Sequence, residues 1–148
     1  MTDSTQRSPK GSPQAPAGQQ APGGDLLLRT LAMPADTNVN GDIFGGWIMS
    51  QMDIAGGILA QQIAAGAVVT VAVDSMKFIS PVQMGDVVCC YGAMKHLGNT
   101  SVALHLEVWV RPRLSRDQGV RPHAKVTEAV FTYVAIDEQG TKRPIPRD

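Results

Sequence analysis

The chain has 148 residues, enough for one domain with a hydrophobic core. Its formal net charge is +0 at pH 7, so composition does not indicate a nucleic-acid or membrane-surface partner. No apolar run approaches the length of a bilayer span, and no apolar secretory segment opens the chain, so we expect neither membrane insertion nor export. The two cysteines, Cys89 and Cys90, are adjacent, and we expect free thiols in a reducing, cytoplasmic environment.

Residues 1–24 differ in composition from the rest, because Ser, Pro, Gln, Gly and Ala dominate them. Such a stretch cannot bury enough apolar surface to offset the entropy lost on ordering. We therefore predict a disordered tail over 1–24 and one folded domain over 25–148.

The folded part is predicted to begin with a strand over 26–33, stopped by Pro34. Turn-forming residues over 36–41 then lead through a Gly-rich loop into the only long helix. This helix runs from Trp47 to about residue 65, with Gly66 as its stop. Apolar residues lie on several of its faces, which predicts a helix covered on most sides.

After the helix, apolar and polar side chains alternate with a period of two, which predicts four strands. They span 68–78, 86–97, 100–111 and 126–136, and Gly98-Asn99 forms a hairpin turn between the second and third. One strand, one helix and four antiparallel strands in meander order predict an α+β fold in which the sheet wraps around the helix.

Asp53 is the unusual residue of the helix. A carboxylate in a largely covered helix must find hydrogen bonds or a wet cleft. Gly56 and Gly57, one turn later, each cost about 1 kcal/mol relative to alanine in a helix interior. We therefore expect another backbone or a ligand to approach the helix closely there. The alternative is that Asp53 faces solvent on a polar stripe with Ser50, Gly57 and Gln61.

Gly45 and Gly46 lie where the first free N–H groups of the helix would point. A helix N-terminus offers unpaired donors and partial positive charge, which suit an anion or a developing oxyanion. Glycine leaves room for a substrate to reach those donors. A flexible turn is the alternative interpretation.

Most sequence motifs of catalysis are missing. The chain has no nucleophile elbow, phosphate-binding loop, dinucleotide fingerprint or zinc-protease motif, and we expect no metal site. The histidines His96, His105 and His123 are isolated, and neither cysteine has an identifiable histidine partner. What remains is carboxylate chemistry at Asp42 and Asp53, which can act as a general base on water or attack an acyl carbon directly.

The segment 33–53, which contains Asn-Gly-Asp-Ile-Phe-Gly-Gly-Trp, resembles the signature of the hot dog fold acyl-CoA thioesterases. The most similar group is the short bacterial acyl-CoA hydrolases, related to the two-domain cytosolic acyl-CoA hydrolases of animals. Segments 68–78, 85–91 and 127–135 agree with the same family pattern. The resemblance implies a long central helix wrapped by a curved antiparallel sheet of about five strands. It also implies a dimer whose sheets join edge to edge, commonly built into a hexamer as a trimer of dimers.

The resemblance further implies hydrolysis of acyl-CoA to a carboxylic acid and CoA at a site on the dimer interface, with no cofactor beyond the CoA of the substrate. Asp53 of one subunit would be general base or nucleophile, and Asp42 of the other would position water or the thioester. The N–H of Gly45 or Gly46 would hold the thioester oxygen. The candidate substrate-binding residues are Asn40, Phe44, Gly45 and Trp47 near the acyl group and Lys77, Lys95, Asn99, Thr100 and Ser101 for CoA.

Alternatives stay open on the same fold. The basic loop over 112–122 is a second candidate for contacting CoA. A hot dog dehydratase would need a catalytic histidine, and none lies between Thr30 and Lys95. A non-catalytic acyl-CoA sensor is the remaining alternative function, although no DNA-binding helix pair can be placed in the chain and we expect no nucleic-acid partner.

Overall fold

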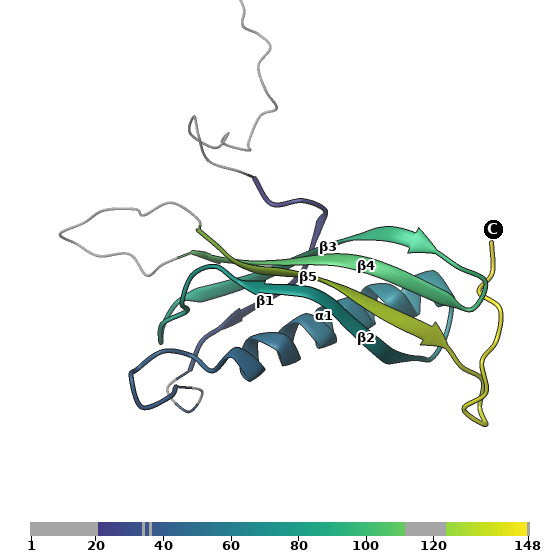
Figure 1. Ribbon diagram of the computed structural model, residues 1–148, viewed down its shortest axis with the longest axis horizontal. Coiled ribbons are helices and arrows are strands. Elements are labelled where there is room, and N and C mark those ends of the chain that lie inside the picture. Colours follow the sequence, from purple (N-terminus) through teal and green to yellow (C-terminus); the bar gives the residue numbers. More distant parts are fainter. Residues whose placement is uncertain (1–20, 34, 36, 112–123, 148) are drawn as a thin grey trace, which may run out of the picture.

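The computed structural model describes residues 21–33, 35, 37–111 and 124–147. In these ranges one helix lies along one face of a single antiparallel sheet (Figure 1). The elements in chain order are β1 (Asp25–Leu31), α1 (Gly45–Ala64), β2 (Val68–Phe78), β3 (Val87–Leu97), β4 (Ser101–Arg111) and β5 (Ala124–Ala135). The predicted single-helix α+β fold is confirmed. Of the predicted tail over 1–24, residues 1–20 lie outside the described residues, and residues 21–24 belong to no helix or strand.

The sheet has five strands in the order β1-β3-β4-β5-β2. The predicted meander is confirmed for β3, β4 and β5, which lie side by side in chain order. It is wrong for β2, which a meander would place beside β3. Strand β2 lies at the far edge of the sheet, beside β5, because α1 carries the chain beneath the sheet from one edge to the other (Figure 1). Both β1 and β2 are therefore edge strands, and β2 has one edge without a hydrogen-bonded neighbour in the protomer.

The core lies between α1 and the inner face of the sheet. The predicted inner face of β4 is confirmed, since Val102, Leu104, Leu106 and Val108 are fully buried, although Glu107 and Trp109 on the opposite face are buried as well. The face of α1 that meets these strands consists largely of small residues, with Met52 as its largest buried side chain. Small side chains let the helix approach the sheet closely, so side chains from the strands can reach across to it.

The helix begins at Gly45, two residues before the predicted Trp47. Phe44 occupies the N-cap position and makes no side-chain capping hydrogen bond, so no capping residue marked this boundary. At the other end Ala65, not Gly66, takes the left-handed conformation. The prediction that the helix is covered on most sides is wrong for the protomer, because Ile54 is 52% exposed.

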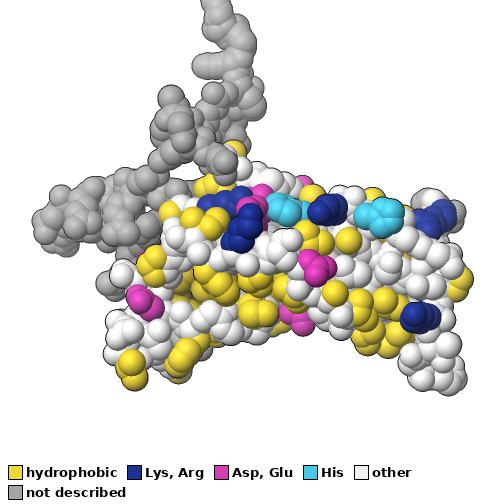
Figure 2. All heavy atoms as spheres, viewed as in Figure 1, with side chains coloured by type: hydrophobic (Ala, Val, Ile, Leu, Met, Phe, Trp, Pro, Cys, Tyr) yellow, Lys and Arg dark blue, Asp and Glu magenta, His cyan; other side chains and the backbone are white. Residues whose placement is uncertain are grey.

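The surface divides into a charged region and an apolar region. Figure 2 shows charged and histidine side chains in a row over the sheet, with apolar side chains below them where Figure 1 places β2. The exposed apolar residues there include Val69, Val71 and Val73 of β2. No helix in the described part of the chain is long and apolar enough to cross a membrane.

Candidate active site

Asp53 is held by two hydroxyl groups from the sheet. It is half-buried in the middle of α1, facing β2 and β5. The Thr70 hydroxyl donates to Asp53 Oδ1 at 2.6 Å, and the Tyr133 hydroxyl donates to the same oxygen at 3.0 Å. Asp53 Oδ2 has no hydrogen-bond partner among the described residues. One carboxylate oxygen is thus fixed and the other is free to meet a substrate or a water molecule.

The close approach expected at Gly56 is present, but it is made by a side chain and not by backbone or ligand. A Cβ at position 56 would collide with the Tyr133 hydroxyl and would lie 2.9 Å from Leu106 Cδ1. A Cβ at Gly57 would meet nothing within 4 Å, so that side of the helix is open next to Asp53.

Tyr133 and Thr70 were not identified from the sequence. Burial and then the hydrogen bond to Asp53 raise the pKa of Tyr133, so its hydroxyl keeps its proton and acts as a donor. Gly56 was the one signal that something approaches Asp53. It did not say which strand residue does so, because Tyr133 follows Asp53 by 80 residues.

The loop before the helix is shaped by Asn38, which sequence reasoning did not single out. Its Oδ1 accepts the N–H of Asn40 at 2.8 Å and that of Asp42 at 3.1 Å. Gly41, between them, has a φ of 84°, which glycine adopts without strain. Asn40 is exposed, and the Asp42 carboxylate has no partner among the residues that the structure describes. An unpaired carboxylate is therefore displayed beside the helix N-terminus.

The first turn of α1 leaves two donors free. The N–H groups of Trp47 and Ile48 both point to the Phe44 carbonyl, at 3.1 and 3.3 Å. Those of Gly45 and Gly46 donate to nothing in the described part of the chain. No acidic side chain lies in this turn to compete for them. The predicted pair of unpaired N–H groups is thus present, inside the helix and not in a loop before it.

Residues around this turn differ in exposure. Phe44 is 52% exposed, whereas Trp47 is half-buried against the core. The ring of Phe78, at the end of β2, lies against Gly45, where a Cβ would be 3.3 Å from it. Phe78 therefore ties the helix N-terminus to the end of β2.

The free donors and Asp53 do not meet within one protomer. Gly45 precedes Asp53 by eight residues, and a rise of 1.5 Å per residue separates them by about 12 Å along the helix axis. A thioester carbonyl cannot contact both. If both act in one reaction, they must come from different copies of the chain.

The candidate CoA-binding residues also fall at two ends of the molecule. Lys95, Asn99, Thr100 and Ser101 lie at or beside the β3–β4 hairpin, at the end of the sheet where α1 stops (Figure 1). Lys77 lies near the opposite end of β2, across from Glu128, where α1 starts. The protomer does not bring the two groups together. The basic loop over 112–122 lies outside the described residues.

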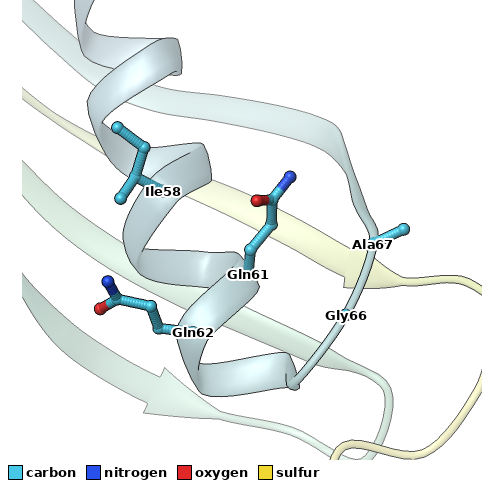
Figure 3. A pocket seen from close by; sticks show the side chains of 5 residues that line it. All are labelled: Ile58, Gln61, Gln62, Gly66 and Ala67. Carbon is cyan, nitrogen blue, oxygen red and sulfur yellow. The ribbon is translucent and has the colours of Figure 1, made fainter.

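One open pocket of about 570 Å³ lies beside the last turns of α1. Figure 3 shows Ile58, Gln61 and Gln62 projecting from the helix, with Ala67 on the segment that follows it. Gln61 is two turns beyond Asp53, on the predicted polar stripe. The open side at Gly57 lies between them, so this flank of the helix offers room along its length.

Cys90 is poorly suited to act as a nucleophile. Both cysteines are free and buried, which confirms the expected free thiols. Burial raises the pKa of the Cys90 thiol to about 12, so little thiolate is present at neutral pH.

A cluster of charged side chains lies on the face of the sheet opposite α1. His105 lies 3.7 Å from Glu107 and 3.3 Å from Glu128, and Lys125 contacts Glu128 at 2.7 Å. The hydrogen bond from Lys125 lowers the pKa of Glu128. His105, Glu107 and Glu128 have the ligand chemistry for a cation, but Lys125 already balances part of their charge. His123 lies outside the described residues.

Two hydroxyl groups hold the Asp53 carboxylate on α1, and free N–H groups lie at the start of the same helix. Together these features define a candidate acyl-transfer site. Residues 40–115 match the thioesterase superfamily. The acyl-CoA thioester hydrolase YciA of Escherichia coli strain K12 is 60% identical over 125 residues, covering 84% of this chain and 93% of that protein. The chain belongs to the thioesterase superfamily and, within it, to the family of acyl-CoA thioester hydrolases.

Solved structures agree with this assignment. The crystal structure of HI0827, a hexameric broad-specificity acyl-CoA thioesterase, is 59% identical with a TM-score of 0.79, covering 88% of this chain and 86% of that chain. Cj0915, a hexameric hotdog fold thioesterase of Campylobacter jejuni, is 42% identical with a TM-score of 0.78, covering 83% and 91%. The predicted family resemblance and the hot dog fold are therefore confirmed.

Proposed function

We propose that this chain hydrolyses acyl-CoA to a free carboxylic acid and CoA, with Asp53 as the reacting carboxylate. The observation that carries the proposal is the fixed Oδ1 and free Oδ2 of Asp53 in a member of a thioester hydrolase family. Water adds to the thioester carbonyl carbon, the carbon–sulfur bond breaks, and the CoA sulfur leaves with a proton. Only water and thioester are consumed, so the proposed reaction needs no further cofactor.

Asp53 can serve this reaction in two ways. As a general base it takes a proton from the attacking water through Oδ2. As a nucleophile it attacks the acyl carbon through Oδ2, and water then hydrolyses the resulting anhydride. Both routes require a carboxylate with one oxygen free, and the two hydrogen bonds to Oδ1 leave Oδ2 free.

The oxyanion donors are proposed to come from a second subunit through the free edge of β2. Val71 is 54% exposed on this long apolar edge, and such an edge is a template for pairing with another strand. Antiparallel pairing of two β2 strands about an axis near Asp74 would set Thr70 opposite the partner's Phe78. Because Thr70 holds Asp53 and Phe78 lies against Gly45, this pairing would bring the partner's Gly45 close to Asp53.

The other site residues take roles in this shared arrangement. Asp42, whose carboxylate is unpaired in the protomer, and Asn40 would come from the partner's loop and position water or the thioester. The N–H groups of Gly45 and Gly46 would stabilise the oxyanion. Phe44 and Trp47 follow the same loop and would flank the acyl chain. We propose that such dimers assemble further into a trimer of dimers, since structural neighbours are hexameric.

The same pairing would place the two sets of CoA-binding candidates at one end of the shared site. The hairpin of one subunit lies at the end of β2 where Thr70 is, and Lys77 of the partner would lie there too. Lys77 and Lys95 would bind CoA phosphates, with Asn99, Thr100 and Ser101 supplying polar contacts. We place this activity in the cytoplasm, where the two thiols would stay reduced.

The test is thiol release from short, medium and long acyl-CoAs, comparing the wild type with Asp53→Asn. Asparagine keeps the shape and an acceptor for the two hydroxyls but cannot take a proton or attack the acyl carbon. We expect kcat to fall by at least about 10²-fold, the scale of a lost general base. Asp25→Asn on exposed β1 is the matched control and should retain turnover. A wild type that binds CoA but turns over no acyl-CoA would overturn the proposal in favour of a sensor.

A further inference from the structure

Tyr133 connects the core of the sheet to the reacting carboxylate. Its side chain is 1% exposed in β5, and its ring stacks on Phe131 with 6.4 Å between ring centroids. A buried tyrosine hydroxyl usually finds a hydrogen-bond partner. Here the partners are Asp53 Oδ1 at 3.0 Å and the Asp53 carbonyl at 3.2 Å. The hydroxyl therefore contacts both the backbone and the side chain of one residue.

The surroundings of this hydroxyl fit a role beyond filling the core. Any side chain at position 56 would collide with the Tyr133 hydroxyl, so a glycine in the helix interior is what admits it. Thr70 approaches the same oxygen from β2, so two strands converge on one atom. No cationic side chain in the described ranges is paired with Asp53, so these two hydroxyls are the groups that orient it.

We propose that Tyr133 is a positioning residue for thioester hydrolysis, which with Thr70 orients the Asp53 carboxylate so that Oδ2 faces the substrate. This inference rests on the proposed function of Asp53. A hydrogen bond to the ionised form of a carboxylate stabilises that form. A carboxylate held at one oxygen also has a single rotamer from which the other oxygen can act, which saves orientation entropy in the reacting complex.

The test is Tyr133→Phe, which removes only the hydroxyl and keeps the ring in the core. We expect kcat to fall about tenfold, the scale of one lost hydrogen bond to a charged group, with KM within about twofold. Tyr91→Phe is the matched control, since Tyr91 is the chain's other tyrosine and lies on the opposite face of the sheet, and it should leave both kcat and KM unchanged.

A second measurement reads the carboxylate without turnover. Infrared difference spectra of ¹³C-aspartate protein at one fixed pH, with Asp53→Asn as the blank, should show that the Asp53 carboxylate band shifts in Tyr133→Phe relative to the wild type, because one hydrogen bond to the carboxylate is lost. Thr70→Val should shift it in the same direction, and Thr70→Ser should restore most of the wild-type behaviour.

The outcomes separate this inference from the proposed function. A wild type without hydrolysis but with the infrared shift would remove the function and keep the interaction between Tyr133 and Asp53. An active, folded Tyr133→Phe protein with unchanged kcat and an unchanged Asp53 infrared band would overturn the positioning role. A change in melting temperature alone would also overturn it, because a purely structural tyrosine predicts that result.

Discussion

At the scale of single residues, the adjacent glycines of α1 face different surroundings. Gly56 is buried, and the Tyr133 hydroxyl and Leu106 occupy the space a Cβ would take. Gly57 is half-buried, and no atom outside its immediate chain neighbourhood lies within 4 Å of such a Cβ. Both glycines lower the helix propensity of α1, but packing in the protomer accounts for only one of them. Alanine substitutions should therefore act in opposite directions at neighbouring positions.

We expect Gly56→Ala to lower the free energy of unfolding by about 1–3 kcal/mol, the usual cost of overpacking a core. It should also lower turnover, because Tyr133 must withdraw from Asp53. Gly57→Ala should raise the free energy of unfolding by up to about 1 kcal/mol through helix propensity. Chemical denaturation of both variants beside the wild type measures this. Equal effects of the two substitutions would contradict the contact made at Gly56.

At the scale of elements, β2 is an edge strand that exposes several apolar side chains. It pairs with β5 on one side only, and its register shifts between Thr70 and Ala72 and again between Asp74 and Lys77. Val71 falls in the first of these irregularities and is 54% exposed. An edge strand with Val69, Val71 and Val73 exposed is unusual in a protein that stays monomeric, because such an edge can pair with another chain.

A charge on this edge should prevent the pairing proposed for it. We expect Val71→Lys to dissociate the assembly and abolish turnover, since a lysine on an edge strand disfavours edge-to-edge contact. Leu26→Lys, on the other edge strand and 43% exposed, is the control and should keep the β2–β2 dimer. Light scattering after size-exclusion chromatography measures the oligomeric state of both variants, and thiol release measures their turnover. An active monomer of Val71→Lys would refute the need for a shared site.

How far the sequence predicted these elements depended on the kind of signal. The alternation in β4 identified its buried face correctly, because a period of two is a property of the strand itself. The position of β2 beside β5 was missed, since alternation shows which face is buried and not which strand is adjacent. The early start of α1 at Gly45 was missed because glycine is a poor helix former and Phe44 is not a capping residue.

The candidate site was predictable where it depends on position within one helix, and not where it depends on contacts between distant segments. Asp53 and the free N–H groups at Gly45 and Gly46 could be proposed from local pattern, since both depend on position within one helix. Thr70 and Tyr133 could not, because their contacts with Asp53 join strands that are distant in sequence. Gly56 carried the only local trace of that convergence.

At the scale of the whole molecule, the proposed reaction centre needs two groups that one protomer does not bring together. Asp53 lies midway along α1, and the free donors lie at its start, about 12 Å away by helix geometry. In a twofold dimer the same two groups occur twice, so each subunit can complete the other's site. In the proposed dimer, each site would take Asp53 from one subunit and the Asp42 loop from the other.

This arrangement predicts complementation between two inactive variants. Asp42→Ala and Asp53→Ala homodimers each lack one member at both sites, whereas a mixed dimer has one site with both residues intact. Random mixing in equal amounts makes half of the dimers mixed, so about a quarter of wild-type turnover should return if each intact site works independently. The two variants are unfolded together and refolded, and thiol release is compared with each variant refolded alone.

The composition of the refolded dimers decides what the result means. Different affinity tags on the two variants allow mixed dimers to be purified, and these should have about half of wild-type turnover per dimer. Purified mixed dimers that stay as inactive as their parents would place both aspartates of each site in one subunit. That geometry would require the chain to bend so that Asp42 reaches Asp53 of the same subunit. The protomer does not have such a bend. Restored activity would instead show that each site uses residues of two subunits, as the proposed pairing of β2 predicts. Val71→Lys is designed to break that same contact.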